Sequence, residues 1–364
     1  MPVTLYTNPF RSGRQTRTDG HCSAEPVECR LPSSRTITIG LVNNMLDGAL
    51  EATERQFLSL LESASDGISI RLLLYSLPGV PRNVPDTRLM LDAYASVDTL
   101  WDTQLDGLIV TGREPVTANL ADEPYWKSFT RLVDWARDNT YSTIWSCLAA
   151  HAAIQYMDDI RRVKNDRKHC GVFDCAKVSD HPLIAGTPSR FKLPHSRWNG
   201  VLAEQLTERG YRVLTQAAEV GVDTFIQQNK SLFVFFQGHP EYESNTLLLE
   251  YRRDVGRYLR GEAETYPRMP QGYFGRDTIA ALTALQQEAE ASRREEMLAE
   301  VTQRLKSVNI EYAWRPTATG IYRNWLEHIC AQKEQRLRAS NVVAAAHRTD
   351  DSIPVMGTAT GTFA

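Results

Sequence analysis

Cys147 stands where a predicted strand turns directly into a predicted helix. The strand covers residues 142–146, and an alanine-rich helical segment follows the cysteine. A side chain at such a turn lies above the carboxyl edge of the sheet, as in the nucleophile elbow. The adjacent helix N-terminus favours the thiolate, and the backbone N–H of Leu148 faces the place where an oxyanion would develop. The position predicts a nucleophile, although free cysteines are also commonly buried structural residues.

A histidine and a glutamate follow another strongly apolar strand. In the segment FVFFQGHPEYE, residues 233–243, His239 comes just after the strand and Glu241 two residues later. The carboxyl ends of parallel strands meet at one edge of a sheet, so we expect His239 to lie near Cys147. Glu241 would then accept a hydrogen bond from the second ring nitrogen and fix the tautomer. The pattern predicts a Cys-His-Glu triad, while a lone histidine could also be structural.

The elements that must position these residues alternate between strands and helices. Apolar, β-branched runs predict strands, and helical spacing of apolar residues predicts the helices between them. The predicted strands are 36–45, 68–77, 105–112, 142–146, 211–215, 222–227 and 231–236, with helices at 50–65, 125–139, 148–157 and 245–260. This order predicts an α/β fold with a doubly wound, mostly parallel sheet flanked by helices.

Four regions are predicted along the chain. Residues 1–36 are polar and without apolar periodicity, which indicates a flexible arm. Residues 37–275 form the α/β domain, and residues 276–338 a helical extension that packs on it. That extension contains one amphipathic helix or a helix pair at 277–306 and a final helix at 321–337, and residues 339–364 are predicted to be a disordered tail.

Composition excludes several classes of function. The 364 residues include 41 Lys and Arg against 44 Asp and Glu, a net charge of -3, so no basic field attracts nucleic acid or an anionic membrane. No run approaches the roughly 18 apolar residues that span a bilayer, and the first thirty lack the pattern of a signal peptide, so we expect a cytoplasmic protein. None of the six cysteines forms a CxxC pair, so neither a disulfide framework nor a metal site is expected.

With these segments in view, the chain resembles the homoserine O-acyltransferases of methionine biosynthesis, the homoserine O-succinyltransferase family. The resemblance covers about 36–275 and resumes near residues 324–326. It rests on IGLVNNM, DGLIVTG, the Tyr125-Trp126 pair, Ser142-Thr143 before Cys147, CGVFD at 170–174, PHSRW at 194–198, GHPEYE at 238–243 and EYRRD at 250–254. It implies the class I glutamine amidotransferase-like fold and a ping-pong reaction through an acyl-cysteine, with acyl-CoA as co-substrate and no bound cofactor.

The resemblance also assigns roles to residues. It places the acyl-accepting cysteine on Cys147, the catalytic histidine on His239 and its partner on Glu241. The backbone amides of Leu148 and of the loop at Gly112 would form the oxyanion hole. The carboxylate of homoserine would bind Arg253 with Glu250 near the substrate amine, and Arg197 is a second candidate for the same pocket. Without the resemblance, Glu250 and Arg253 would be read as an exposed helical charge cluster.

The acyl donor depends on the loop that follows Gly112. Val116 occupies a position where the family's succinyl enzymes tend to have Gly and its acetyl enzymes Glu. Arg113 could pair with the free carboxylate of a succinyl group, while Glu114 could turn inward and repel it. The balance favours succinyl-CoA over acetyl-CoA. Acetyl transfer, or acylation of a related hydroxy amino acid, remains the alternative.

Two rival functions remain at this point. A Cys-His-Glu site in this fold can also hydrolyse glutamine, but the flanks of Cys147 are Trp145 and Ala149 where Gly-x-Cys-x-Gly would be usual. A noncatalytic homologue would have no need to keep the three triad residues together. The sequence also differs from the family at His151, where Gln is expected. We expect a homodimer whose partners are small molecules, homoserine and acyl-CoA, with neither nucleic acid nor membrane.

Overall fold

The computed structural model describes residues 2–6, 34–82 and 94–350 of the chain. Its centre is one mixed sheet of ten strands in the order β1-β3-β2-β4-β5-β10-β9-β8-β6-β7. The parallel part consists of β1 (Val3–Tyr6), β3 (Ser69–Tyr75), β2 (Thr36–Val42), β4 (Gly107–Thr111), β5 (Ser142–Ser146) and β10 (Leu232–Phe236). The antiparallel part consists of β9 (Gly221–Gln228), β8 (Arg212–Ala217), β6 (Val163–Lys177) and β7 (Arg190–Gly200).

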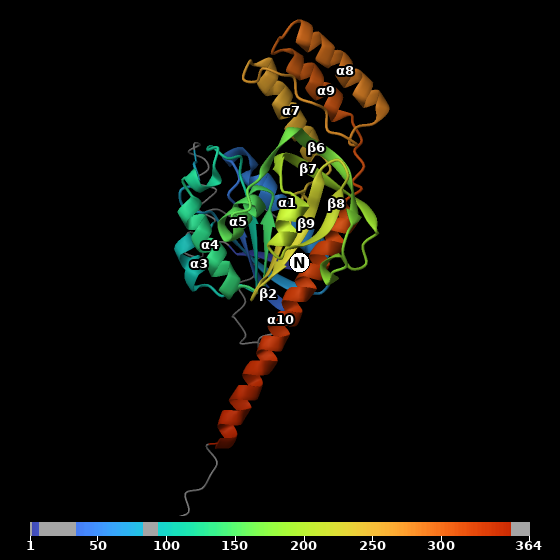
Figure 1. Cartoon of the computed structure of the whole chain (residues 1–364). Helices are drawn as coiled ribbons and strands as arrows, with labels where there is room; N and C mark the ends of the chain where they lie inside the picture. Colours follow the sequence, from blue (N-terminus) through green and yellow to red (C-terminus); the bar gives the residue numbers. More distant parts are fainter. Residues whose placement is uncertain (1, 7–33, 83–93, 351–364) are drawn as a thin grey trace, which may run out of the picture.

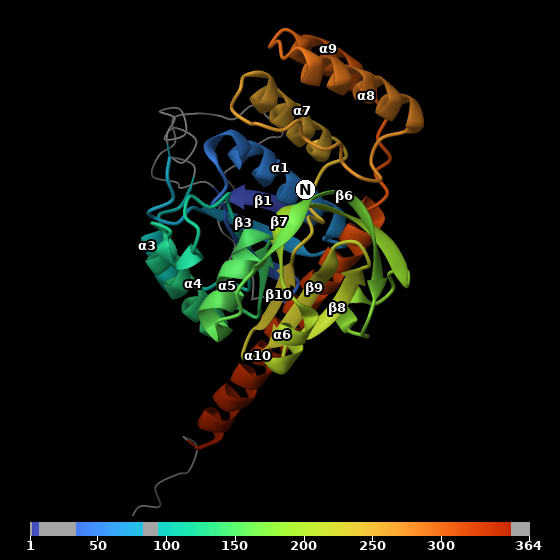
Figure 2. The ribbon, with the colours of Figure 1, turned by 45° about the horizontal axis from the view of Figure 1, so that its top comes forward.

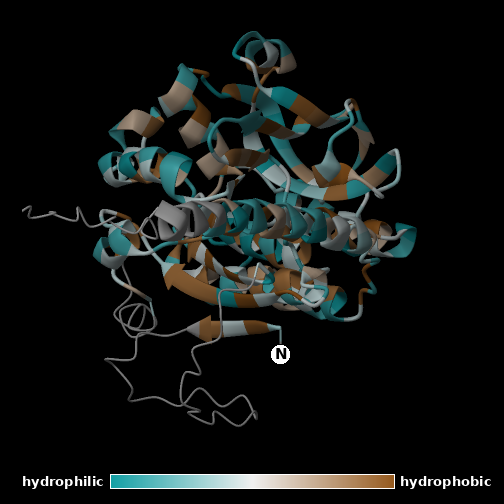
Figure 3. Cartoon of the chain, turned by 90° about the horizontal axis from the view of Figure 1, so that it is seen from below, coloured by the Kyte–Doolittle hydropathy of each residue, from teal (hydrophilic) through white to brown (hydrophobic). Residues whose placement is uncertain are grey.

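Helices cover both faces of the sheet, so the predicted doubly wound α/β class is confirmed (Figure 1). One face carries α3 (Val97–Asp102), α4 (Trp126–Asn139), α5 (Leu148–Asp158) and the short α6 (Ala203–Glu208). The other face carries α1 (Leu50–Ala64) and α10 (Arg315–Asp350), which pack on each other. Figure 3 shows the hydrophobic strands in the interior and hydrophilic residues on the outer sides of the helices.

Alternation along β5 assigns its side chains to the two faces. Ile144 belongs to the apolar cluster that contains residues of α1 and α10, whereas Trp145 belongs to the cluster that contains residues of α4 and α5. Successive side chains of a strand point to opposite faces, so Ser142 and Ser146 lie on the α10 side with Ile144. This arrangement determines which helix can reach the end of β5.

The C-terminal extension is helical, as predicted. The segment 277–306 is a helix pair, α8 (Arg276–Ala291) and α9 (Met297–Lys306), which lies against α7 (Thr246–Leu259) away from the sheet (Figure 2). The final helix is longer than predicted, because α10 continues to Asp350. Residues 339–350 are therefore helical where a tail was predicted, consistent with the helix propensity of their alanines. Residues 351–364 lie outside the described residues.

Three strands were not predicted. β1 lies in the predicted N-terminal arm and pairs with β3, while residues 7–33 of that arm lie outside the described residues. β6 and β7 form a long antiparallel hairpin that carries the CGVFD and PHSRW segments. Three short 3-10 helices complete the described elements: Asp47–Ala49, Leu120–Asp122 and Pro182–Ile184.

Candidate active site

Cys147 lies at the predicted turn between β5 and α5. Its φ of 51° and ψ of -109° are unusual for a residue with a side chain, and conformations of this kind concentrate at functional sites. Its backbone N–H donates to the carbonyl of Phe236 on the neighbouring strand at 2.7 Å. The half-buried side chain is thus held at the carboxyl edge of the sheet, at the N-terminus of α5.

His239 and Glu241 come from the turn that follows β10, and β10 pairs directly with β5. The His239 Nδ1 lies 2.8 Å from the Glu241 Oε1, so Nδ1 carries a proton and donates it in a hydrogen bond to the carboxylate, which leaves Nε2 for the cysteine. The backbone N–H of His239 donates to the carbonyl of Pro194 at 2.8 Å. Tyr242 stacks on the imidazole with ring centroids 4.2 Å apart. The hydrogen bond to Glu241 and the stacking of Tyr242 fix the orientation of the imidazole ring.

The charges of the triad favour an imidazolium. Burial alone lowers the pKa of His239, but the negative charges of Cys147 and Glu241, together with hydrogen bonds to both, raise it well above its ordinary value. A protonated His239 beside the sulfur of Cys147 is the arrangement by which a cysteine nucleophile is activated.

Gly112, the residue predicted to contribute to an oxyanion hole, lies against the start of α5. A Cβ at this position would be 2.5 Å from the Leu148 Cβ and 2.7 Å from the Ala149 nitrogen. Only glycine permits so close an approach of the loop after β4 to the helix. The loop at Gly112 therefore lies directly against the first residues of α5, which follow Cys147.

His151, which departs from the family pattern, ties α5 to the loop after β10 that carries His239 and Glu241, named the catalytic loop for its proposed role. Its Nε2 lies 3.0 Å from the Gln237 Oε1, and the Gln237 amide nitrogen donates to the carbonyl of Val222. Burial, with a smaller effect of Arg197, lowers the pKa of His151 to about 3. A neutral His151 can thus donate to Gln237, two residues before His239.

A cluster of polar side chains adjoins His239 on the side of Tyr242. The Tyr242 hydroxyl donates to the Glu250 Oε1 at 2.7 Å, and the Ser196 hydroxyl donates to the other oxygen of Glu250. Lys168 lies 3.8 Å from Glu250 and 3.1 Å from Asp254. This cluster, called the acceptor pocket after the role proposed for it below, combines two carboxylates, an ammonium and two hydroxyls from α7, β6, β7 and the loop after β10.

Arg253 lies on α7 at the exposed side of this cluster, next to Asp254. Its Nε and Nη2 donate to the Asp254 Oδ1 at 2.9 and 2.8 Å, and its side chain is 56% exposed. Burial lowers the pKa of Arg253, but the charge of Asp254 and the hydrogen bond to it, with Glu250 and Glu114 beyond, give a net rise. The guanidinium is therefore accessible from solvent and keeps its charge beside Glu250.

Arg197, unlike Arg253, is buried, and its guanidinium donates hydrogen bonds to backbone carbonyls and to a histidine. Its Nη1 donates to the carbonyl of Asn199 at 2.7 Å, and its Nη2 donates to the carbonyls of Val220 and Val222. Its Nε donates to His195 Nδ1 at 3.3 Å. These contacts support a role in holding β7 against β9 rather than in binding a substrate carboxylate.

Cys175, His195 and Asp223 bring three possible metal-ligand atoms within 4.8 Å of one another. Because Arg197 donates to the His195 Nδ1, the proton of the neutral ring is on Nε2, which lies 3.3 Å from the Asp223 Oδ1. Burial, assisted by the charge of Asp223, raises the pKa of the Cys175 thiol. Metal ligation needs a thiolate and a free imidazole nitrogen, so this cluster favours a buried His-Asp pair over a cation site.

The loop after Gly112 holds Arg113 and Val116 in different environments. Arg113 is buried and donates to the carbonyls of Glu114 and Pro81, with no carboxylate in salt-bridge distance among the described residues. Val116 is 60% exposed, and its N–H donates to the buried Glu123 at 2.8 Å. Glu123 thus fixes the loop, and Arg113 has no ion-pair partner there.

Sequence reasoning missed three residues of the acceptor pocket: Lys168, Ser196 and Tyr242. Ser196 and Tyr242 lie inside the PHSRW and GHPEYE segments, and Lys168 comes two residues before CGVFD. Their polar side chains within otherwise recognisable segments were the available signal. What was missing was the β6–β7 pairing, which places Cys170 opposite Ser196 and so brings the two segments together.

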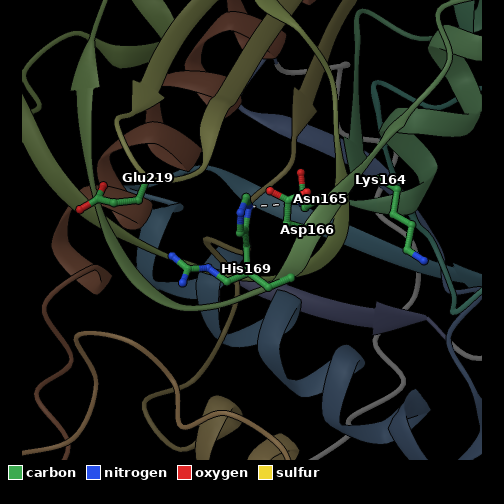
Figure 4. A pocket seen from close by; sticks show the side chains of 6 residues that line it. Lys164, Asn165, Asp166, His169 and Glu219 are labelled. Atoms are coloured by element: carbon green, nitrogen blue, oxygen red, sulfur yellow. Dashed lines mark hydrogen bonds between the residues drawn. The ribbon is translucent and has the colours of Figure 1, made fainter.

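A surface depression lies beside β6. It is lined by Lys164, Asn165, Asp166, Arg167, His169 and Glu219, and the Asn165 amide and His169 ring are 3.3 Å apart (Figure 4). Its lining includes two cations, Lys164 and Arg167, and two carboxylates, Asp166 and Glu219. This mixed lining gives no preference for a ligand of either charge.

The fold and the site define an α/β protein with a Cys-His-Glu triad at a strand-to-helix turn. The family model for homoserine O-succinyltransferase matches residues 19–336. Homoserine O-succinyltransferase of Rhodopseudomonas palustris is 47% identical over 86% of this chain and 93% of its own length. That of Bradyrhizobium japonicum is 46% identical over 80% and 90%. The chain belongs to the homoserine O-succinyltransferase family.

A solved structure of glutamine amido transferase from Methylobacillus Flagellatus also resembles this chain. It covers 81% of this chain and 95% of its own, with 15% identity and a TM-score of 0.46. Among the described helices, none is both long enough and apolar enough to cross a membrane.

Proposed function

We propose that this chain transfers a succinyl group from succinyl-CoA to the hydroxyl of L-homoserine, through an acyl-cysteine, in methionine biosynthesis. The observation that carries the proposal is the junction of the triad with the acceptor pocket. Tyr242 stacks on His239 and donates to Glu250, so one side chain touches both the base and the pocket. A nucleophile and an amino-acid pocket so joined suit acyl transfer to a small polar acceptor.

In the first half-reaction the Cys147 thiolate attacks the thioester carbon of succinyl-CoA. The carbonyl oxygen becomes an oxyanion, which the amides at Gly112 and Leu148 stabilise. The carbon–sulfur bond to CoA then breaks, and the imidazolium of His239 gives its proton to the leaving thiolate. The products are free CoA and succinyl-Cys147, with His239 neutral.

The loss of charge from the sulfur prepares the second half-reaction. The Cys147 charge is one of the two that raise the pKa of His239, and the thioester no longer carries it. The pKa of His239 therefore falls, and the neutral imidazole accepts the proton of the homoserine hydroxyl as its oxygen attacks the acyl carbon. Collapse of the second oxyanion releases O-succinylhomoserine and restores the thiolate and imidazolium.

The acceptor pocket supplies charges that match an amino acid. Arg253 would bind the homoserine carboxylate with its planar guanidinium, and Glu250 would accept from the ammonium group. Lys168 and Asp254 hold these two residues in place through their ion pairs. Burial raises the pKa of Asp254, but Lys168 and Arg253 outweigh it and lower that pKa, so the carboxylate stays ionised.

Arg113 supports succinyl as the acyl group. Its buried guanidinium has no carboxylate in salt-bridge distance among the described residues, and it follows directly after Gly112. A succinyl carboxylate entering from the oxyanion hole would supply that missing partner. Acetyl-CoA would leave the charge unpaired.

The test is mass spectrometry of the purified protein after incubation with succinyl-CoA, and separately with acetyl-CoA, followed by L-homoserine. We expect a succinyl adduct on the peptide that contains Cys147, which disappears as O-succinylhomoserine forms. An adduct that water removes as fast as homoserine does would instead indicate a hydrolase. No adduct with either donor would contradict the proposal. A cytoplasmic location and a homodimer stay predictions, which cell fractionation and light scattering would test.

A further inference from the structure

One carboxylate oxygen of Glu241 accepts no hydrogen bond from His239 or from Cys147. Its Oε1 is 2.8 Å from His239 and 3.5 Å from the Ser146 hydroxyl. Its Oε2 is buried and has no hydrogen-bond partner among the described residues. A buried, ionised carboxylate with an unsatisfied oxygen is costly, so an additional donor is expected there.

The hydroxyl of Tyr322 on α10 is likewise buried without a hydrogen-bond partner among the described residues. The ring stacks on Phe236 with centroids 6.2 Å apart at an interplanar angle of 18°. Phe236 is the last residue of β10, three residues before His239.

Both groups lie on the same face of the sheet. Phe236 is the register partner of Ser146, whose hydroxyl faces Glu241, and the two residues lie on the α10 side. Trp325, one helical turn after Tyr322, donates to the Ser142 hydroxyl at the other end of β5. α10 therefore runs along β5 and β10, with Tyr322 at the end where the triad lies.

The same extension holds the next residue of the catalytic loop. The Trp314 ring nitrogen and the Tyr312 hydroxyl both donate to the carbonyl of Tyr242, at 2.8 and 3.0 Å. The electrostatic environment agrees, since burial and then the charge of Glu241 raise the pKa of Tyr322. The Tyr322 hydroxyl therefore keeps its proton and can act as a donor.

We propose that Tyr322 is a positioning residue that donates to the free oxygen of Glu241 through one buried water. The water would satisfy two orphaned oxygens at once, which is the usual role of buried water in proteins. Glu241 is then held from both oxygens, by His239 on one side and by the C-terminal helix on the other. The triad becomes a chain of four residues, Cys147, His239, Glu241 and Tyr322. This inference rests on the proposed function only in treating His239 and Glu241 as the catalytic pair.

The experiment compares Tyr322→Phe with Tyr266→Phe. Each change removes one buried hydroxyl from the same apolar cluster, but Tyr266 packs against Tyr258 and interacts with Tyr251, both on α7. Two rates are measured against pH: acylation by succinyl-CoA, followed as CoA release, and alkylation of Cys147 by iodoacetamide. The melting temperature is measured for each protein.

In Tyr322→Phe we expect both rates to fall about tenfold to a hundred-and-fiftyfold near neutral pH, the range for loss of one hydrogen bond to a charged group. The acid limb of both profiles should move to higher pH, because a carboxylate with fewer donors binds a proton more readily. Tyr266→Phe should stay within twofold of the wild type in both rates, with an unchanged acid limb.

Equal profiles in the wild type and Tyr322→Phe would overturn the proposal. So would losses in both variants that follow their melting temperatures, since that result indicates a structural role only. Failure of the proposed function is distinguishable, because wild-type protein that succinyl-CoA does not acylate still reacts with iodoacetamide. The shift of the alkylation profile then decides the role of Tyr322 alone.

Discussion

The two halves of the site are built in different ways. The triad and its oxyanion hole depend on backbone geometry: the φ of 51° at Cys147, the close approach of Gly112 to α5, and the pairing of β5 with β10. The acceptor pocket depends on side chains that meet from several elements, with Lys168 from β6, Ser196 from β7 and Glu250 from α7. Under the proposed function, the comparison assigns the reaction to the turn at the sheet edge and recognition of the acceptor to a cluster of charged side chains.

The comparison predicts that changes at the turn stop the first half-reaction, and that changes in the pocket spare it. Loss of the nucleophile should have the largest effect. Cys147→Ala should form no acyl adduct and should lower kcat at least about a thousandfold, because neither half-reaction has a path without the sulfur. Mass spectrometry and steady-state assays measure this, with Cys330→Ala, a buried cysteine on α10, as the control. A succinyl adduct on another cysteine of the Cys147→Ala protein would refute the assignment.

Gly112→Ala should come next. The new Cβ would lie 2.5 Å from the Leu148 Cβ, so the loop must move away from α5 and the oxyanion loses a donor. We expect acylation to slow about a hundredfold to a thousandfold, the cost of losing one such donor. Stopped-flow detection of CoA release measures it. Gly275→Ala, where nothing lies within 4 Å of the added Cβ, is the control and should match the wild type. Unchanged acylation in Gly112→Ala would separate this loop from the oxyanion hole.

Arg253→Lys should affect only the second half-reaction. The planar fork is lost while the charge is kept, so we expect transfer to homoserine to fall about tenfold to a hundredfold and acylation of Cys147 to stay within twofold. Single-turnover assays separate the two steps, and Arg257→Lys, one turn further along α7, is the control. If acylation fell as much as transfer, Arg253 would belong to the donor site or to the fold.

The elements that carry the triad could be predicted from the sequence, whereas those that build the acceptor pocket could only partly be predicted. The strand at 142–146, the helix after it and the strand before His239 have local signals, namely apolar runs and an alanine-rich segment, and all three were predicted correctly. β6 was not predicted, because VKNDRKHCGVFDCAK mixes charged and apolar residues without a clear alternation. Without β6 and β7, nothing in the sequence placed Lys168 beside Glu250. The role of Tyr322 was equally hidden, since it depends on where α10 crosses the sheet.

Arg113→Ala should have the smallest effect, and one that depends on the donor. We expect kcat/KM for succinyl-CoA to fall about fivefold to tenfold, since a partly desolvated ion pair with the succinyl carboxylate is lost. The value for acetyl-CoA should change little or rise. Because Arg113 is buried, the ratio of the two donors is the decisive quantity: a structural defect would lower both alike and leave the ratio unchanged.

The central claim is that the charge on Cys147 controls the protonation of His239, so that one histidine acts first as an acid and then as a base. The most direct measurement is an NMR titration of the His239 imidazole, with isotope-labelled histidine, in the wild type and in Cys147→Ala. We expect a pKa above the ordinary value of about 6.5 in the wild type. It should fall in Cys147→Ala, which carries no charge at this position, as the acyl-enzyme does not. The same pKa in both proteins would contradict the account.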